Sequence, residues 1–449
     1  MTDPSNRYLA GNFAPVRTEL TTTDLRVTGT IPRELVGRLL RIGPNPADEV
    51  DPATYHWFTG SGMVHGVRLR DGRAEWYRRR WVRDDHVCGV RGWPALDGPR
   101  CPMGNAANVA NTHVIGHAGR TWALVEGGGQ PVELTWDLES VARRDFGGTL
   151  RGAFTAHPKR DPATGELHAV AYYFEWDHLR YLVVGTDGRV RRTVDVPVAG
   201  KPMVHDCAIT ARHVLLLDLP VTFDVEAALQ GVALPYRWNP ERPARVGLLP
   251  RDGDAGAVRW VEVPPCFVFH PLNAYDLPDG RVVVDVVRHP RMFADDVRGP
   301  NEGLPTLVRW TLDPARGRAV EQPLDDRGVE FPRHDERLVG KPHRFGYTAT
   351  FGEGVAHGPA HKWDLATGRI ETHDHGPGRV TLEPVFVPRA PDAAEDDGWI
   401  LSYVHDATTD RSDVVILHAQ DFAGTPLATI HLPDRVPFGF HGSWVPDAG

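Results

Sequence analysis

The chain has 449 residues, of which 41% are hydrophobic and 24% are charged, an ordinary balance for a soluble globular protein. Its formal net charge of -9 argues against a nucleic-acid partner, because that partner requires a basic face to meet its phosphates. Length alone allows two or three domains, but no Ser/Gly linker or composition shift divides the sequence. We therefore expect one domain over residues 1–449.

The N-terminal stretch MTDPSNRYLAGNFAPV lacks the basic and apolar regions of a signal peptide, and no segment offers about 18 consecutive apolar residues for a membrane span. Cys88, Cys101, Cys207 and Cys266 lie far apart, without the close pairing of a zinc ribbon or a redox motif. The sequence therefore predicts free thiols and a cytoplasmic location.

Short strand-like runs separated by glycine turns dominate the chain from end to end. An Asp-Gly pair at Asp71, Asp187 and Asp279 favours tight hairpins, because glycine adopts positive φ at little steric cost. Few stretches are helical in pattern, and the best candidates are residues 223–234 and 137–146. The expected strands include GVRLR, RTWALVE, LRYLVVG, HVLLLDLPV, RVVVDVV, TLVRWTL, WILSYV and DVVILHA.

A loose internal similarity links residues 134–141, 308–318 and 361–369, each of which has a Trp two residues before a Leu. Such recurrence fits a β-propeller, whose small antiparallel sheets bury their faces against their neighbours. The period is irregular, so chance resemblance among aromatic strands explains these three segments equally well.

Four histidines each follow a short apolar run and precede Pro, Asp or Gly, as residues at a strand end do: His157, His205, His270 and His441. Their separations in sequence exclude a shared helical turn, but strands of a propeller converge on a central axis where remote side chains meet. Taken singly, each is more often a structural histidine than a metal ligand. Spacing alone leaves both interpretations open.

The chain resembles the carotenoid cleavage oxygenases, a family of non-haem iron dioxygenases, nearly from end to end. The motifs that carry this resemblance include GTIPRELVGRLLRIGPNP, YHWFTGSGMVHG, TWALVEGG, FTAHPKRDPATGELH, VHDCAIT, FVFHPLNAYD, EFPR, EPVFVPR and the terminal FHGSWVP. The resemblance implies an all-β, seven-bladed β-propeller with an irregular helix and loop cap over the metal-bearing face.

The same resemblance implies that His157, His205, His270 and His441 bind Fe(II), with dioxygen as co-substrate and no catalytic side chain beyond the metal centre. It further implies that Glu126, Glu330 and Glu383 accept hydrogen bonds from the distal nitrogens of three ligand histidines. Such a carboxylate fixes the ring's tautomer and makes the metal-bound nitrogen more basic. Which Glu holds which His is left open, and so is the metal's identity by ligand chemistry alone, since four imidazoles also suit zinc, copper or nickel.

The implied reaction is cleavage of one double bond of a lipophilic polyene into two carbonyl products. Family members that cleave phenolic stilbenes are expected to carry a Lys before the outer Glu, whereas Val125 stands here. A phenol hydroxyl buried against valine would lack a partner, which favours a carotenoid or apocarotenoid over a stilbene. A stilbene-cleaving dioxygenase and a non-oxidative polyene isomerase remain the alternatives.

The sequence leaves alternatives open for the substrate-binding residues and for residues 220–236. Trp57, Phe58, Phe154 and Phe269 either line an apolar tunnel or pack the core, so no substrate-binding residue is assigned. Residues 220–236 either form a lid or make a peripheral membrane contact, although they hold no Lys or Arg to meet anionic headgroups. Nothing in the sequence indicates an obligate protein partner.

Overall fold

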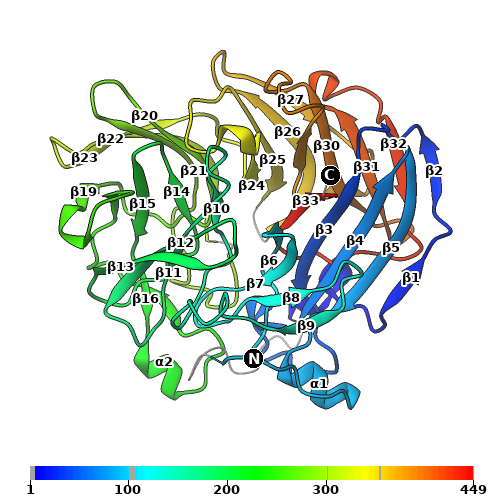
Figure 1. The fold of residues 1–449 in the computed structure, drawn as a ribbon, viewed down its shortest axis with the longest axis horizontal. Coiled ribbons are helices and arrows are strands. Elements are labelled where there is room, and N and C mark those ends of the chain that lie inside the picture. The colour runs from blue at the N-terminus through cyan, green and yellow to red at the C-terminus, as the bar shows by residue number, and fades with distance from the viewer. Residues whose placement is uncertain (1–5, 101–107, 301, 353–354, 448–449) are drawn as a thin grey trace.

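The computed structural model describes residues 6–100, 108–300, 302–352 and 355–447. Its regular structure consists mainly of strands arranged around a central axis (Figure 1). The helices of the described residues are short: α1 Asp85–Arg91, α2 Val225–Leu229, and the 3-10 turns Arg7–Leu9, Gly11–Phe13, Trp57–Thr59, Ala255–Ala257, Glu336–Leu338 and Ala419–Asp421. None of the helices described has the length and apolar character needed to cross a bilayer. The all-β class is confirmed.

Three sheets are four-stranded antiparallel meanders whose strand order follows the sequence. The first contains β6 His113–His117, β7 Arg120–Leu124, β8 Val132–Leu134 and β9 Ser140–Arg143. The second contains β10 Lys159–Arg160, β11 Leu167–Ala171, β12 His178–Val184 and β13 Val190–Pro197. The third contains β24 Val329–Arg333, β25 Phe345–Phe351, β26 His357–Asp364 and β27 Arg369–His373.

Two further sheets join the ends of the chain to each other. The five-stranded sheet has the order β1 Leu20–Thr22, β5 Arg73–Trp81, β4 Gly62–Arg70, β3 Gly37–Pro44 and β33 Gly442–Pro446. The six-stranded sheet has the order β2 Arg26–Gly29, β32 Ala428–His431, β31 Arg411–His418, β30 Gly398–Asp406 and β28 Arg379–Thr381, with β29 Val385–Pro388 also paired to β30. An early strand thus pairs with a late one in both sheets, which closes the ring where blue and red ribbons meet in Figure 1.

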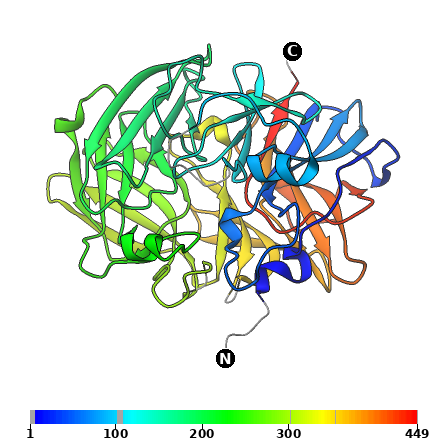
Figure 2. The same cartoon turned by 90° about the horizontal axis from the view of Figure 1, so that it is seen from below.

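The remaining strands form an eight-stranded sheet and a hairpin. The eight-stranded sheet has the order β14 Cys207–Ile209, β15 His213–Asp218, β18 Arg245–Pro250, β19 Arg259–Glu262, β23 Arg318–Pro323, β22 Thr306–Asp313, β21 Val282–Arg288 and β20 Pro271–Asp276. The hairpin pairs β16 Val221–Phe223 with β17 Tyr236–Trp238, and α2 lies in the loop between them. Figure 2 shows α2 on the side of the ring that carries the N-terminus, away from the C-terminus.

The propeller arrangement is confirmed, but the expected division into seven separate blades is not. Two neighbouring meanders share one sheet, because their outer strands β19 and β23 form a parallel pair at Glu262 and Arg318. A hydrogen bond from the Glu262 amide to the Gly317 carbonyl, 2.9 Å long, supports this junction. Because the outer strands of the two meanders pair with each other, fewer backbone N–H and C=O groups remain unpaired at the edges of the sheet.

The expected strands are all present, and one expected helix is wrong. Residues 137–146 contain β9, because Ser140–Arg143 pairs with β8 and buries Ala142 in the sheet. The similarity among residues 134–141, 308–318 and 361–369 has a structural counterpart, since each spans the last hairpin of a meander: β8–β9, β22–β23 and β26–β27. Cys88, Cys207 and Cys266 are free and buried, whereas Cys101 lies outside the described residues.

Candidate metal centre

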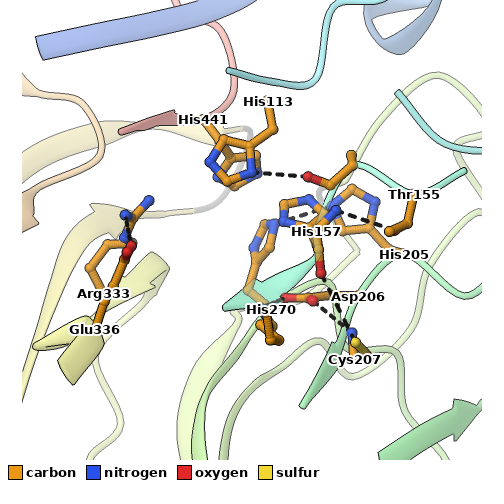
Figure 3. A network of polar contacts seen from close by, with 12 residues as sticks. His113, Thr155, His157, His205, Asp206, Cys207, His270, Arg333, Glu336 and His441 are labelled. Carbon is orange, nitrogen blue, oxygen red and sulfur yellow. Dashed lines mark hydrogen bonds and ion pairs between the residues drawn. The ribbon is translucent and has the colours of Figure 1, made fainter. Parts of the chain in front are cut away.

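The four histidines singled out in the sequence come together at the axis of the ring. Each precedes the strand at one edge of a sheet: His157 precedes β10, His205 precedes β14, His270 precedes β20 and His441 precedes β33. Their rings gather in one place although they come from remote segments (Figure 3). The order of strands around the axis, rather than proximity in sequence, brings them together.

A glycine permits the close approach that places His441. A Cβ on Gly442 would lie 2.1 Å from the carbonyl oxygen of Leu40 in the neighbouring strand β3, so no larger residue fits there. Gly442 pairs with Arg41 at the end of the β3–β33 ladder, and His441 therefore leaves the sheet directly toward the axis.

The potential ligand atoms of the four histidines all lie within 4.8 Å of one another, close enough to hold a single metal ion. The Nε2 atoms of His205 and His270 are 3.1 Å apart, and Nε2 of His157 is buried without a hydrogen-bond partner in the described structure. A buried nitrogen lone pair without a donor is costly unless an ion or a water satisfies it. The residues present therefore fit a metal ion.

His270 is fixed by the carboxylate of Glu330. Nδ1 of His270 lies 2.6 Å from Oε2 of Glu330, while Oε1 of the same carboxylate lies 2.9 Å from Nε2 of His289. The amide of Phe331 also donates to Oε2, over 2.5 Å. Because an ionised carboxylate only accepts, His270 carries its proton on Nδ1 and presents the lone pair of Nε2 to the centre.

His441 is fixed in the same way by Glu383. Nδ1 of His441 lies 2.9 Å from Oε1 of Glu383, and the amide of Gly442 donates to Oε2 over 2.7 Å. Arg333 compensates this buried carboxylate, since its guanidinium lies 3.2 Å from Oε1 of Glu383 and also donates to the Gly442 carbonyl over 2.9 Å. Burying a carboxylate is costly unless it is paired, and Arg333 supplies the pair.

His205 has a looser arrangement with Glu126. Its Nδ1 lies 2.8 Å from Oε2 of Glu126, within ion-pair distance, but the N–H is not directed along a formed hydrogen bond. The hydroxyl of Tyr172 donates to the other oxygen, Oε1, over 3.1 Å. Glu126 is therefore held from one side by Tyr172 and faces His205 on the other.

His157 differs from the other three because no carboxylate among the described residues holds its ring. Beside it lies the ring of His113, the first residue of β6, with centroids 5.6 Å apart. Nδ1 of His113 is 2.9 Å from the carbonyl oxygen of Ala156, and its Nε2 is 3.2 Å from Oγ of Ser443. His113 thus connects the segment that carries His157 with the strand that follows His441.

Burial keeps several of these imidazoles neutral. It lowers the pKa of His157 and of His441 well below the ordinary value, and neighbouring histidines lower it further. Burial also lowers the pKa of His113, to about 4. For His270 the desolvation opposes protonation, but the Glu330 carboxylate outweighs it and raises the pKa. Neutral imidazole is the form that binds a metal ion.

Two cavities of different chemistry reach the centre. An apolar cavity of about 800 Å³ is bordered by His205, His270 and His441, and its wall includes Trp57, Phe58, Val125 and Phe269. A polar cavity of about 780 Å³ is bordered by His157, His270 and His441, and its wall includes Lys159, Asp206 and Arg333. The apolar cavity therefore reaches the centre at His205, His270 and His441, and His157 faces the polar one.

Sequence patterns missed several residues that the structure brings to the site. His113, His289 and Tyr172 contact ligands or outer carboxylates, yet each stands in an ordinary strand or strand-end pattern. The position of His113 at the start of an inner strand is the one signal that matches the four other histidines. Phe154 does not line the apolar cavity and packs against Phe146 in the core.

Known proteins are similar to this chain over nearly its whole length. The family model described as retinal pigment epithelial membrane protein matches residues 13–446. The carotenoid cleavage oxygenase of Mycobacterium tuberculosis (strain ATCC 25618 / H37Rv) is 47% identical, covering 99% of this chain and 98% of its own. The isoeugenol monooxygenase of Pseudomonas nitroreducens is 32% identical, covering 98% of each chain.

Two solved structures share the whole architecture. The lignostilbene dioxygenase of Pseudomonas brassicacearum superposes with a TM-score of 0.90 at 30% identity, covering 100% of both chains. The cobalt-substituted oxygenase ACO of Synechocystis superposes with a TM-score of 0.85 at 29% identity, covering 96% of this chain and 97% of its own.

Proposed function

Because this chain belongs to the family of the retinal pigment epithelial membrane protein and the carotenoid cleavage oxygenases, we propose that it cleaves a carbon–carbon double bond of a carotenoid or apocarotenoid. The enzyme is an oxygenase. The observation that carries the proposal is the cluster of four histidines at one end of an apolar cavity of about 800 Å³. A lipophilic polyene fits such a wall, whereas a polar substrate would lose its hydration there.

We propose Fe(II) as the metal and His157, His205, His270 and His441 as its ligands, with Glu126, Glu330 and Glu383 as the outer carboxylates. Four imidazoles would suit ferrous iron, and a set of only four protein ligands would leave the ion able to bind small molecules as well. When bound, the iron supplies the redox chemistry that lets dioxygen oxidise the double bond. The three carboxylates would offset the ion's two positive charges and orient the rings that bind it.

The protein's own residues position the substrate and exclude water from the metal centre. Addition of both oxygen atoms of dioxygen across the double bond yields two carbonyl groups, so the overall reaction requires no proton or electron from a side chain. The apolar wall, including Phe58, Val125 and Phe269, positions the polyene beside the centre and excludes water from it. The proposed catalytic unit is the whole chain, residues 1–449, because strands from both ends of the sequence close the ring around the site.

Two other functions are compatible with the same scaffold. Cleavage of a phenolic stilbene would use the same centre, and the similarity to a lignostilbene dioxygenase makes it the stronger alternative. Val125 argues against it, since this residue lines the cavity with a branched apolar group that offers a phenol oxygen no hydrogen bond. A non-oxidative isomerase would retain the four histidines but consume no dioxygen.

Product analysis under labelled dioxygen tests the proposal. The purified, iron-loaded protein is incubated with a panel of carotenoids, apocarotenals and stilbenes under ¹⁸O₂, and the products are analysed before exchange with water. We expect one labelled oxygen in each of two carbonyl products from an apocarotenoid. Label in only one product would indicate a monooxygenase, and a rearranged polyene formed equally without dioxygen would indicate an isomerase.

We also propose that residues 220–236 contact a membrane peripherally, where lipophilic substrates reside. Val225 and Leu229 of α2 line the apolar cavity and are nevertheless 59% and 85% exposed, so α2 forms an apolar rim at its entrance. Because residues 220–236 hold no Lys or Arg, we expect binding to zwitterionic vesicles without a preference for anionic ones. Flotation of the native protein and of Leu229→Glu tests this. Recovery of the native protein only in the soluble fraction would favour a lid.

A further inference from the structure

The apolar cavity contains two neighbouring phenols, Tyr172 and Tyr236, which differ in one respect. Their rings lie edge to face with centroids 6.0 Å apart. The Tyr172 hydroxyl donates to Glu126 over 3.1 Å and is therefore occupied. The Tyr236 hydroxyl makes no hydrogen bond with any residue in the described ranges, although the side chain is only 6% exposed and lines the cavity. Unlike the hydroxyls of Tyr8 and Tyr347, which are buried without a partner in the described structure, this hydroxyl is accessible from the cavity and is therefore free to bind a polar atom of a ligand there.

Tyr236 is held firmly in this position. It is the first residue of β17 and pairs with Phe223 of β16, and its ring lies edge to face with the ring of Phe223 at 5.6 Å. The loop between these strands carries α2, so the strand pairing fixes Tyr236 just inside the rim that α2 forms. A donor on a paired strand is preorganised, which lowers the entropy lost when it binds a ligand.

The location of Tyr236 in the cavity defines which part of a ligand it meets. On the outer side lie Val225 and Leu229, which are largely exposed. On the inner side Tyr172 connects through Glu126 to His205 at the metal centre. A linear polyene that enters past α2 with one end leading would extend beyond the metal centre at that end. Its trailing end would then lie beside Tyr236. Among the cavity's other polar groups, Glu126 and Glu330 are already engaged by Tyr172 and by histidines.

The chemistry of the hydroxyl sets the class of end group. Burial raises the pKa of Tyr236 far above the ordinary value of a phenol, so the group stays protonated. A neutral phenol both donates and accepts, and it can bind the oxygen of an aldehyde, a ketone or an alcohol. A hydrocarbon end group would instead leave the hydroxyl without a partner in an apolar environment.

We propose that Tyr236 is a specificity-determining residue that binds the terminal oxygen of the substrate, so that the enzyme prefers oxygenated polyenes such as apocarotenals over hydrocarbon carotenoids. This inference rests on the proposed function and narrows its substrate class. The hydrogen bond to Tyr236 would also orient the substrate. The oxygenated end would lie at the entrance beside α2, and the hydrocarbon end would extend past the metal centre.

Binding without turnover provides the test. The iron-loaded protein is titrated under anaerobic conditions with an apocarotenal, its alcohol, and the hydrocarbon of equal length in which a methyl group replaces the aldehyde. Quenching of tryptophan fluorescence reports Kd. We expect the aldehyde and the alcohol to bind about five- to tenfold more tightly than the hydrocarbon, the ratio that one buried hydrogen bond gives. Tyr236→Phe should reduce this ratio to about one without weakening hydrocarbon binding.

Tyr181→Phe is the matched control, because it removes a buried phenol that does not line the cavity and whose hydroxyl lies 2.7 Å from Nδ1 of His168. It should retain the preference for oxygenated ends. Equal native affinities for aldehyde and hydrocarbon, or a preference that persists in Tyr236→Phe, would overturn the assignment. Native protein that shows the preference but cleaves no polyene in air would overturn the proposed function and leave the assignment of Tyr236 intact.

Discussion

Nδ1 of His113 lies 2.9 Å from the carbonyl oxygen of Ala156, the residue that precedes His157. A carbonyl only accepts, so Nδ1 carries the proton, and the neutral ring's Nε2 accepts from the hydroxyl of Ser443 at 3.2 Å. His113 therefore joins the segments of His157 and His441, which lie far apart in the sequence. It occupies the start of inner strand β6 as the four proposed ligands occupy the starts of other inner strands, but it acts through hydrogen bonds to the chain.

Replacing His113 by Phe should weaken metal binding by about tenfold, because partners beyond the ligands orient them and their loss typically reduces affinity to this degree. His113→Asn should restore part of the loss, since its amide can donate to the Ala156 carbonyl. Titration of the metal-free protein with Fe(II) or Co(II) measures the effect. His361→Phe is the control, because His361 also bridges two side chains, Thr350 and Thr372, away from the centre. Equal affinities in the His113 and His361 variants would contradict a positioning role.

The outer carboxylate Glu330 gives a second prediction. Its two oxygens accept from His270, His289 and the amide of Phe331, so a glutamine in its place would direct an N–H toward at least one donor. Glu330→Gln should therefore lower iron affinity by roughly 10- to 100-fold. Iron quantification after dialysis against a chelator provides the measurement. The exposed Glu241→Gln serves as control, and iron retention equal to that of the native protein would contradict the role of Glu330.

A residue of this site is predictable from the sequence only where a local sequence pattern marks its position. His157, His205, His270 and His441 end apolar runs, so their strand-end positions were visible, but their convergence depends on strands paired across the ring. The sequence of residues 137–146 predicts a helix, but Ser140–Arg143 pairs with β8, and this contact between strands decides the structure of the segment. Tyr172, His289 and Arg333 act through contacts with carboxylates from other sheets, and no local pattern encodes such contacts.

The composition of the cavity wall at Val125 gives a prediction about specificity. Val125 precedes Glu126 and lines the apolar cavity, so a phenol hydroxyl beside it would lack a partner at a cost of about 1–3 kcal/mol. We expect kcat/KM for a phenolic stilbene to be at least roughly tenfold below that for an apocarotenal, since about 1.4 kcal/mol corresponds to a factor of ten. Val125→Lys should shift the ratio toward the stilbene, and Val125→Leu should not. Efficient stilbene cleavage by the native enzyme would contradict the preference inferred from Val125.

Buried histidines outside the metal centre predict how stability depends on pH. Burial lowers the pKa of His56, His168 and His361 to about 4, whereas in the unfolded chain each returns to about 6.5. Between these two values the unfolded chain binds protons that the folded protein does not, so stability falls as pH falls. Each of these histidines should contribute a loss of roughly 1.4 kcal/mol per pH unit in this window and little change above about pH 7.

Thermal midpoints recorded from pH 7.5 down to about 4.5 test this dependence on metal-free protein, which separates it from loss of iron. His361→Gln should flatten the slope below about pH 6.5, because one proton fewer is taken up on unfolding. His86→Gln is the control, since His86 is exposed on the surface and lies outside the buried set. A midpoint that rises as the pH falls from 6.5, or a slope unchanged by His361→Gln, would show that these imidazoles do not remain neutral in the folded protein.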